Sequence, residues 1–379
     1  MDFKLSDATV LIRNSAREYL KEKCPSSFVK EMIEDETGFS RTMWKEMAEL
    51  GWLGMLFDDE YGGSGGSEGS FFDFFTVLVE LGRVLLPSPL FPSAIVSGLI
   101  LDQAGDEELK RSLLPSIVEG DTILTAALLD EGGEYDFHDP KLQVVEGPGG
   151  WYTVTGTRIL VPYAHVADAV IVCGAVQGSE SGGPTLFKIG TQTPGQELVP
   201  LATLSGEKTF AVTYENATVS SDDIIGEVGK GAEYLERVLP KLIVLKCGEM
   251  LGGLERVVEL TVNHVKERRQ FGAPLGALQA VQHHCADMET FLASTRLITC
   301  QAAFLVGEGL PCDKEVAMAK AWCSDAYKKC TWIGQQLHGG VGFTDEYDIH
   351  LYYKHAKESE LMFGDSRYHR WKVADRMGL

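Results

Sequence analysis

The stretch Gln336–Phe343, which reads QLHGGVGF, decides the fold of this 379-residue chain. Its glycines end a long helical pattern and allow the backbone to approach a ligand closely. Earlier in the chain, Arg268–Gly272 reads RRQFG and ends another long helical pattern. Later comes Met362–Asp365, which reads MFGD.

The residues around these stretches carry apolar side chains at the three-to-four spacing that is typical of amphipathic helices. The spacing predicts helices over Leu242–Arg269, from Gln279 to about Val306, and from Lys314 to about Leu337. Long helices joined by short loops favour antiparallel packing. Residues 229–379 are therefore expected to form a C-terminal antiparallel four-helix bundle.

Two regions precede this bundle. Residues 1–121 are predicted to be helical, with helices over Leu11–Lys23 and Thr42–Leu50 and with Ser40 as the N-cap of the second. In residues 122–228 the pattern changes to short apolar or alternating runs separated by Gly and Pro, which predicts strands. The expected fold class is α+β, with an N-terminal helical domain, a central β-barrel or sandwich and the C-terminal bundle.

Charge and cysteine content exclude several classes of function. The formal net charge of −21 disfavours nucleic acid as a partner, because its phosphates would be repelled. The eight cysteines form no C-x-x-C pair and no Cys/His cluster with zinc spacing, so no metal site is expected. The N-terminus lacks a signal-peptide layout and no apolar run is long enough to span a bilayer. Reduced thiols and a cytoplasmic location are the expectation.

Taken together, these stretches resemble the hallmarks of the acyl-CoA dehydrogenase family along nearly the whole chain. Trp44–Gly54 resembles the family's first-domain helix, and Glu60–Gly63 resembles the loop that follows it. The resemblance implies FAD as cofactor and an acyl-CoA thioester as substrate. A carboxylate within hydrogen-bonding reach would remove the α-proton, while the β-hydrogen leaves as hydride to the flavin.

The resemblance places the catalytic base where this chain has no acid. In many members the base precedes the glycine of a Y-E-G-T-like tetrapeptide, and here that position is Phe363. Other members carry it on the long helix before R-x-x-F-G, at a position that corresponds to about Leu242. Glu249 lies about two helical turns beyond Leu242, roughly 10 Å along the axis, and Glu236 lies six residues before it. Neither glutamate is expected to replace the base.

Asp365 is a fallback candidate for the base. If residues 362–366 are extended, residues 363 and 365 point to the same side of the backbone. Asp365 would then act as a relocated base, although its shorter side chain would need a shifted backbone. Glu358 and Glu360 are interpreted as a solvated patch, and His338 as a packed residue rather than a catalyst.

The flavin-ring end of the family's site is eroded in this sequence. Leu129–Asp136 reads LDEGGEYD where the family has a T-E-P-x-x-G-S-D-like loop. Leu160–Pro162 reads LVP where the family has a W-I-T-like strand. Proline has no backbone N–H to donate and leucine does not stack as an indole does.

The nucleotide end is intact. In the family's tetramers, the R-x-x-F-G and Q-x-x-G-G motifs reach the flavin held by a neighbouring subunit. Arg268 would offer a guanidinium fork to a phosphate and Phe271 an apolar face, while glycines let the backbone approach closely. The candidate FAD-binding residues are Arg268, Gln270, Phe271, Gln279, Gln336, Gly339 and Gly340.

This asymmetry leads to one hypothesis and two alternatives. The hypothesis is an accessory subunit of a heteromeric acyl-CoA dehydrogenase, of α2β2 type, whose homologous partner holds the flavin ring and supplies the base. By analogy with heteromeric family members, the acyl group would be bulky, such as a steroid side chain. The alternatives are a self-sufficient flavoenzyme with Asp365 as base, and a redox-inactive acyl-CoA-binding scaffold.

Overall fold

The computed structural model describes residues 5–66, 69–133, 137–177 and 183–379, and the chain divides into two compact units. Unit 1 combines Met1–Glu31, Phe71–Leu86 and Pro240–Leu379, and unit 2 combines Met32–Ser70 and Pro87–Leu239. Each unit therefore takes part of the N-terminal helical region. The division into domains at residues 121 and 228 stays a prediction.

The N-terminal region is helical, as expected. The Ser40 hydroxyl accepts a hydrogen bond from the Met43 amide at 3.2 Å, which confirms its role as N-cap. A π-helix over Phe91–Ser97 leads into the fifth helix. The helices are α1 (Asp7–Lys23), α2 (Ser26–Glu34), α3 (Arg41–Glu49), α4 (Ser70–Val84), α5 (Gly98–Ala104) and α6 (Glu107–Val118).

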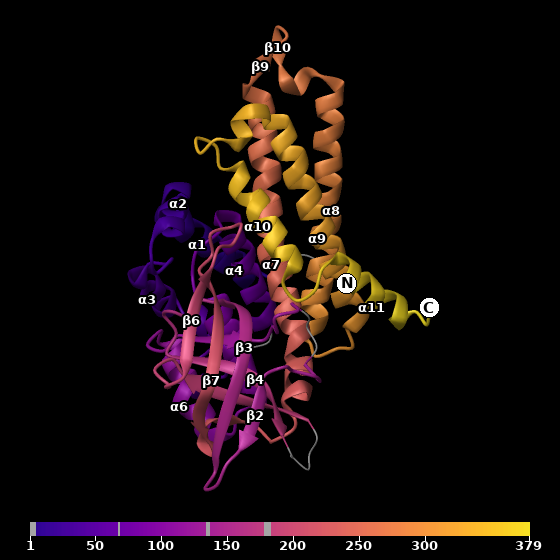
Figure 1. Cartoon of the computed structure of the whole chain (residues 1–379). Coiled ribbons are helices and arrows are strands. Elements are labelled where there is room, and N and C mark those ends of the chain that lie inside the picture. Colours follow the sequence, from indigo (N-terminus) through magenta and orange to yellow (C-terminus); the bar gives the residue numbers. More distant parts are fainter. Residues whose placement is uncertain (1–4, 67–68, 134–136, 178–182) are drawn as a thin grey trace. The chain divides into compact units, whose positions relative to one another are not determined.

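The central region is a β-sheet domain whose described strands form one mixed sheet of eight (Figure 1). The strand order is β6-β7-β3-β2-β4-β5-β8, with β1 paired in parallel to β4. Its core is built from inward-facing side chains such as Val154, Val172, Phe187 and Tyr214. The strands are β1 (Leu124–Ala127), β2 (Gln143–Glu146), β3 (Trp151–Pro162), β4 (Ala169–Gln177), β5 (Pro184–Gly190), β6 (Gln196–Leu201), β7 (Thr209–Ser220) and β8 (Ile224–Ile225).

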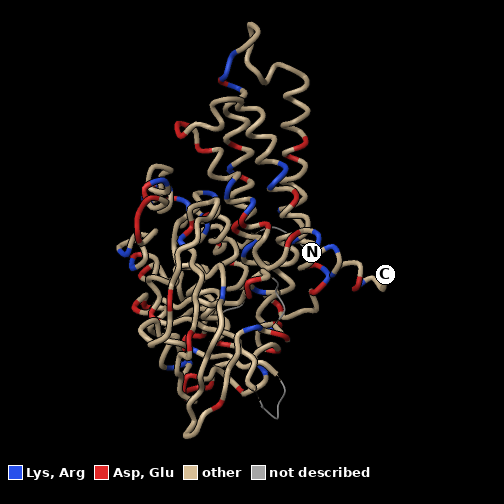
Figure 2. The backbone as a smooth tube through the Cα atoms, in the orientation of Figure 1, with Lys and Arg blue, Asp and Glu red and all other residues tan. Residues whose placement is uncertain are grey.

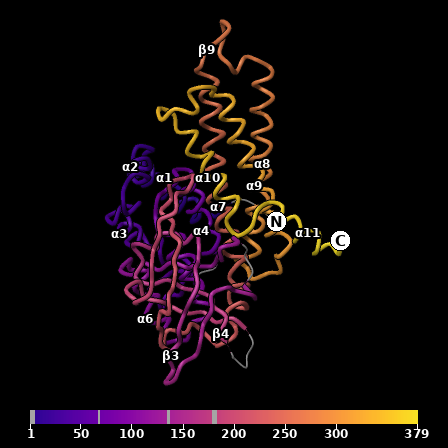
Figure 3. The backbone as a smooth tube through the Cα atoms, viewed as in Figure 1, coloured from indigo at the N-terminus to yellow at the C-terminus, as the bar shows by residue number. Residues whose placement is uncertain are grey.

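The C-terminal region is helical, and α9 packs against α8, α10 and α11 (Figures 1 and 3). The long helix α7 joins the same bundle, because Glu249 contacts His355 of α10 and Glu255 contacts Arg296 of α8. The helices are α7 (Gly231–Glu267), α8 (Gln279–Gly307), α9 (Asp313–His338), α10 (Ile349–Leu361) and α11 (Ser366–Arg376).

The predicted bounds of α8 and α9 agree with the structure to within about one residue at each end. The start of α7 was predicted too late, because the helix begins at Gly231 and continues through Pro240. Among the described helices, α8 has a length and apolar composition that would suit a membrane span. The same properties are found in helices of bundles, and α8 packs along α9.

Candidate functional site

The motif residues gather at one end of the helical bundle of unit 1, hereafter the tip, where α7 ends, α8 begins and α9 ends (Figure 1). RRQFG forms a small antiparallel hairpin, with β9 (Arg269–Gln270) paired to β10 (Ala273–Pro274). Arg268 and Arg269 give this hairpin positive charge (Figure 2). Positive charge on a protruding loop suits contact with an anionic group.

Phe271 occupies the turn of this hairpin in a costly conformation. Its φ of 54° lies in the left-handed region, as does the φ of 81° at Gly272. This two-residue turn suits Asn or Gly at both positions, and a bulky residue there costs on the order of 1 kcal/mol. Phe271 is nevertheless 88% exposed, so its ring gains no burial within this chain. Its strain and exposure indicate a contact made outside the chain.

The glycines of QLHGGVGF lie in two different environments. Gly342 packs against its own chain, because an added Cβ would lie 2.6 Å from the side-chain Oε1 of Gln335 and 3.0 Å from Cβ of His338. An added Cβ at Gly339 or Gly340 would meet nothing within 4 Å. Gly339 has a φ of 66°, whereas Gly340 has no such backbone requirement. No atom of the described chain fills the space beside Gly340.

The three glutamines of the candidate set also lie at this end and are exposed. Gln270 belongs to β9, Gln279 is the first residue of α8, and Gln336 lies in the last turn of α9. The tip therefore presents amide, guanidinium, aromatic and bare backbone groups together.

Beneath the tip, His338 is buried and stacks on His264 with ring centroids 4.2 Å apart. The His338 Nδ1 donates to the carbonyl oxygen of Gly334 at 2.7 Å. The expectation that His338 is a packed residue is therefore confirmed. The partnership with His264 gave no signal in the sequence, because 74 positions separate the two residues.

The position of the missing base lies at the other end of α10. This helix starts near the tip and its 13 residues span about 20 Å before the MFGD loop. Phe363 is buried, with a φ of 58°, and its carbonyl oxygen accepts a hydrogen bond from Nε2 of His369 at 2.9 Å. Burial lowers the pKa of His369 to about 4, so this ring is neutral near pH 7. The loop thus holds an apolar side chain where a carboxylate was expected.

Residues 362–366 are not extended throughout, because Phe363 and Gly364 both have positive φ, so the condition for Asp365 to share a side with residue 363 is not met. Asp365 serves as the N-cap of α11, and its Oδ1 accepts a hydrogen bond from the Tyr368 amide at 2.8 Å. The Asp365 carboxylate therefore has a structural partner within the chain.

Glu360 is not part of a solvated patch. It is buried, and its carboxylate binds Lys328 and Lys357. Lys320 anchors the same loop from α9. Its buried ammonium group donates to the carbonyl oxygens of Ser359, Glu360 and Gly364 at 2.9–3.0 Å.

The alternative base position on α7 also lacks an acid, since Leu242 is buried and apolar. Glu249 accepts hydrogen bonds from Lys246 and His355, each at 2.7 Å. Burial raises the pKa of Glu249, but Lys246 and the hydrogen bond with His355 outweigh it and lower that pKa to about 2. A carboxylate this acidic is a poor proton acceptor for an α-carbon.

The segment of unit 2 that the family resemblance assigns to the flavin ring can be described in part. The Asp130 carboxylate forms an ion pair with the buried guanidinium of Arg158. Leu160 is 48% exposed with a φ of 54°, where the family places an indole. Glu134–Asp136, the remainder of this loop, lies outside the described residues. These side chains offer a flavin ring few hydrogen-bond donors, whereas the tip carries exposed guanidinium and amide groups.

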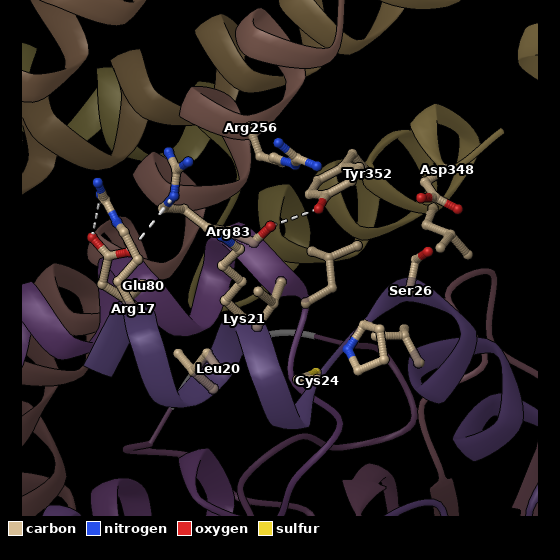
Figure 4. Close-up of a pocket in the computed structure, with 15 residues that line it drawn as sticks. Arg17, Leu20, Lys21, Cys24, Ser26, Glu80, Arg83, Arg256, Asp348 and Tyr352 are labelled. Carbon is tan, nitrogen blue, oxygen red and sulfur yellow. Dashed lines mark hydrogen bonds and ion pairs between the residues drawn. The ribbon is translucent and has the colours of Figure 1, made fainter. Parts of the chain in front are cut away.

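A separate cavity of about 320 Å³ lies within unit 1 between α1, α4, α7 and α10 (Figure 4). Its guanidinium groups are already paired. Arg17 binds Glu80 through two hydrogen bonds of 2.7 and 2.8 Å, and Arg83 binds Glu255 at 3.0 Å. Because these guanidinium groups already have carboxylate partners, the cavity is interpreted as part of the packing between helices.

Comparisons with known proteins identify the two helical regions. Residues 6–121 match the model of the acyl-CoA dehydrogenase N-terminal domain, and residues 229–378 match that of the acyl-CoA dehydrogenase C-terminal domain. The acryloyl-CoA reductase (NADH) of Anaerotignum propionicum is 27% identical to this chain, over 99% of this chain and 95% of its own length.

Two solved structures with similar folds are each named for two proteins. A chain of the ChsE4–ChsE5 complex from Mycobacterium tuberculosis is 28% identical with a TM-score of 0.88, covering 100% of this chain and 99% of that one. The Tcur3481–Tcur3483 steroid ACAD is 26% identical with a TM-score of 0.86, covering 98% of each chain.

Proposed function

We propose that this chain, which belongs to the acyl-CoA dehydrogenase family, is the accessory subunit of a heteromeric enzyme. Members of the family use FAD, which supplies the hydride acceptor when bound. In this proposal, the tip of unit 1 binds the adenine and pyrophosphate end of an FAD whose ring is held by a homologous catalytic subunit. That partner also supplies the base.

The observation that carries this proposal is the contrast between the two ends of α10. At the tip, Phe271 is strained and 88% exposed, and Gly340 leaves open space that this chain does not fill. At the other end, the base position holds the buried Phe363. A chain that has lost all cofactor contact would have no reason to keep a strained, exposed phenylalanine.

Each residue of the tip has a defined task in this arrangement. Arg268 would bind a phosphate oxygen through its guanidinium, which remains charged at any working pH. Phe271 would cover an apolar face of the cofactor, and Gly340 would let the backbone approach it. The glutamines would satisfy polar groups that lose water on binding.

A partner subunit is also favoured by apolar side chains exposed along the bundle. Leu297 and Phe304 of α8 and Trp332 of α9 are 54%, 40% and 50% exposed. Exposed apolar groups gathered on helices typically mark protein contacts. An α2β2 assembly and a cytoplasmic location are part of the proposal.

The substrate of the assembly is proposed to be a bulky acyl-CoA. The chain is similar in structure to a steroid ACAD that is named for two proteins. This chain itself has Phe363 at the position of the base, so the proposed partner subunit would supply the carboxylate that reacts with the substrate. Asp365 is a weaker candidate for a base because its carboxylate caps α11. A steroid-CoA thioester is therefore the first substrate to test on the complex.

The test is to purify the chain alone and together with a homologous acyl-CoA dehydrogenase subunit encoded beside it. We expect no flavin absorbance from the chain alone and FAD in the complex, reduced on addition of acyl-CoA. In the complex, Arg268→Ala should weaken FAD binding, whereas Arg376→Ala, which removes an exposed guanidinium elsewhere on unit 1, should not. A chain that alone binds a full complement of FAD and reduces it with acyl-CoA would contradict the proposal.

A further inference from the structure

Two motif segments of the tip are joined by a pair of stacked imidazoles. His264 lies in the last turn of α7, and its carbonyl oxygen accepts a hydrogen bond from the amide of Arg268, just beyond the helix end, at 2.8 Å. His338 directly precedes Gly339 at the end of α9. Their rings are 4.2 Å apart between centroids, with planes inclined by 22°. The stack thus links the end of α7, which Arg268 follows directly, to the turn that carries Gly339 and Gly340.

The surroundings hold both rings in place. Tyr347 meets each of them edge-on, with centroids 5.9 Å from His264 and 6.0 Å from His338. The hydrogen bond from His338 Nδ1 to Gly334 fixes the tautomer and the orientation of that ring. The geometry of the stack is therefore set by three segments of chain rather than by the pair alone.

Both rings are neutral near pH 7. Burial lowers the pKa of His338, and burial together with His338 and Arg268 lowers that of His264 to about 4. Neutral rings stack without charge repulsion. Arg268 then remains the cation that faces an incoming phosphate.

We infer that His264 and His338 are a positioning pair that sets the spacing between Arg268 and the Gly339–Gly340 turn. The inference rests on the proposed function and deepens it. The pair determines the span over which the chain holds an anionic dinucleotide. Neither ring needs to touch the cofactor, because each acts through the neighbour it holds.

The experiment measures FAD affinity of the co-purified complex by flavin fluorescence. His264→Ala should weaken FAD binding by roughly three- to tenfold, the effect of losing one aromatic pair. His264→Phe keeps a ring in the stack and should restore affinity to near the starting value. His283→Ala, on an exposed histidine of α8, is the matched control and should have no effect.

A double substitution separates positioning from general loss of structure. If the two rings act through one another, His264→Ala with His338→Ala should weaken FAD binding no more than the worse single substitution. Additive losses, or failure of His264→Phe to restore affinity, would overturn the inference. Thermal melting of each variant shows whether the fold is kept, and rescue by Phe applies even if His264→Ala lowers stability.

Arg268→Ala distinguishes this inference from the proposed function. If Arg268→Ala leaves FAD affinity of the complex unchanged, the tip does not bind the cofactor and the proposed function fails. If Arg268→Ala weakens binding while His264→Ala does not, the proposed function stands and the positioning pair is wrong.

Discussion

The ammonium nitrogen of Lys320 lies 3.0 Å from the carbonyl oxygen of Gly364, and so ties α9 to the loop that holds Phe363. The group is buried, and the same nitrogen also satisfies carbonyl oxygens at the C-terminal end of α10. A cation suits that end of a helix because the carbonyl dipoles point toward it. The loop is thus held by a buried cation, although lysine is among the residues most rarely found in a protein core.

Replacing this cation should loosen the loop. Lys320→Met has a similar volume but leaves three buried carbonyl groups without a donor, and we expect the free energy of unfolding to fall by about 1–3 kcal/mol near pH 7. Chemical denaturation monitored by tryptophan fluorescence measures this change. Lys314→Met, at an exposed lysine of the same helix, is the control, and equal stability of the Lys320→Met protein would contradict the role of the clamp.

Lys320 should also make the free energy of unfolding depend on pH. Burial lowers the pKa of Lys320 from 10.5 to about 8, so between these values the unfolded chain binds more protons than the folded chain. Stability contributed by this group therefore rises as pH increases from about 8 to about 10.5. The pKa of Lys320 is also influenced by the neighbouring charged or titratable groups of Cys247, Cys323, Lys246 and Glu360. Because thiols and tyrosines titrate in the same pH range, the pH dependence is compared with that of Lys320→Met. The unfolding free energy of that variant should lack this part of the rise.

Two glycines of the tip should respond in opposite ways to alanine. Gly340→Ala should leave stability within about 0.5 kcal/mol, because the added methyl meets no atom of the chain, yet it should weaken FAD binding by the complex. Gly342→Ala should cost about 1 kcal/mol, since its Cβ would lie 3.0 Å from Cβ of His338 and would displace the side-chain amide of Gln335. Melting curves and flavin titration of the pair check this. Unchanged FAD affinity in Gly340→Ala would count against an external ligand at the tip.

Substitution of Phe271 in the strained turn should raise the stability of the hairpin and lower the affinity for FAD. Phe271→Asn should relieve the backbone strain and stabilise the hairpin by about 1 kcal/mol, since Asn tolerates the left-handed region. The same change should weaken FAD binding by the complex, because it removes the exposed ring. Thermal denaturation and fluorescence titration measure the two effects, and an Asn variant that binds FAD as tightly as Phe would exclude a role for the ring.

The ion pairs beside the cavity of Figure 4 should stabilise unit 1. Glu80 is almost fully buried and binds Arg17, whereas Arg83 also binds Glu255 and Glu259, so Glu80→Gln chiefly leaves Arg17 without its carboxylate partner. Because Arg17 is 47% exposed, we expect a loss of about 1–2 kcal/mol in the free energy of unfolding. Glu233→Gln breaks an exposed pair with Arg237 and should have no measurable effect by the same denaturation assay. Similar losses in both variants would show that burial of Glu80 is unimportant.

Local patterns predicted the helices well and the contacts poorly. The 3.6-residue period placed α8 and α9 almost to the residue, and Ser40 was found by its capping chemistry. The start of α7 was missed because Pro240 disfavours a helix interior, yet the bundle tolerates it there.

Long-range pairing of charges explains the remaining differences. Arg158 and Glu360 are charged residues that sequence places on the surface, and each is buried only because a distant partner neutralises it. Glu249 meets His355 across 106 positions, a relationship no spacing rule contains. The candidate cofactor residues were found together because short motifs at helix ends carry them. The stacked His264 and the Lys320 clamp were missed because their partners are remote in sequence.

Restoring a carboxylate at position 363 should not by itself give this chain acyl-CoA dehydrogenase activity. Phe363→Glu would restore a carboxylate at the base position, but the side chain sits in a buried, apolar environment. We expect the substitution to destabilise the chain by about 2–4 kcal/mol, and the purified chain alone to gain no flavin and no reduction by acyl-CoA. The reason lies in unit 2, where Leu160 and Pro162 replace the residues that would hold the ring. Phe363→Leu, which stays apolar, is the control. If Phe363→Glu alone conferred acyl-CoA-dependent flavin reduction, the division of labour between two subunits would be wrong.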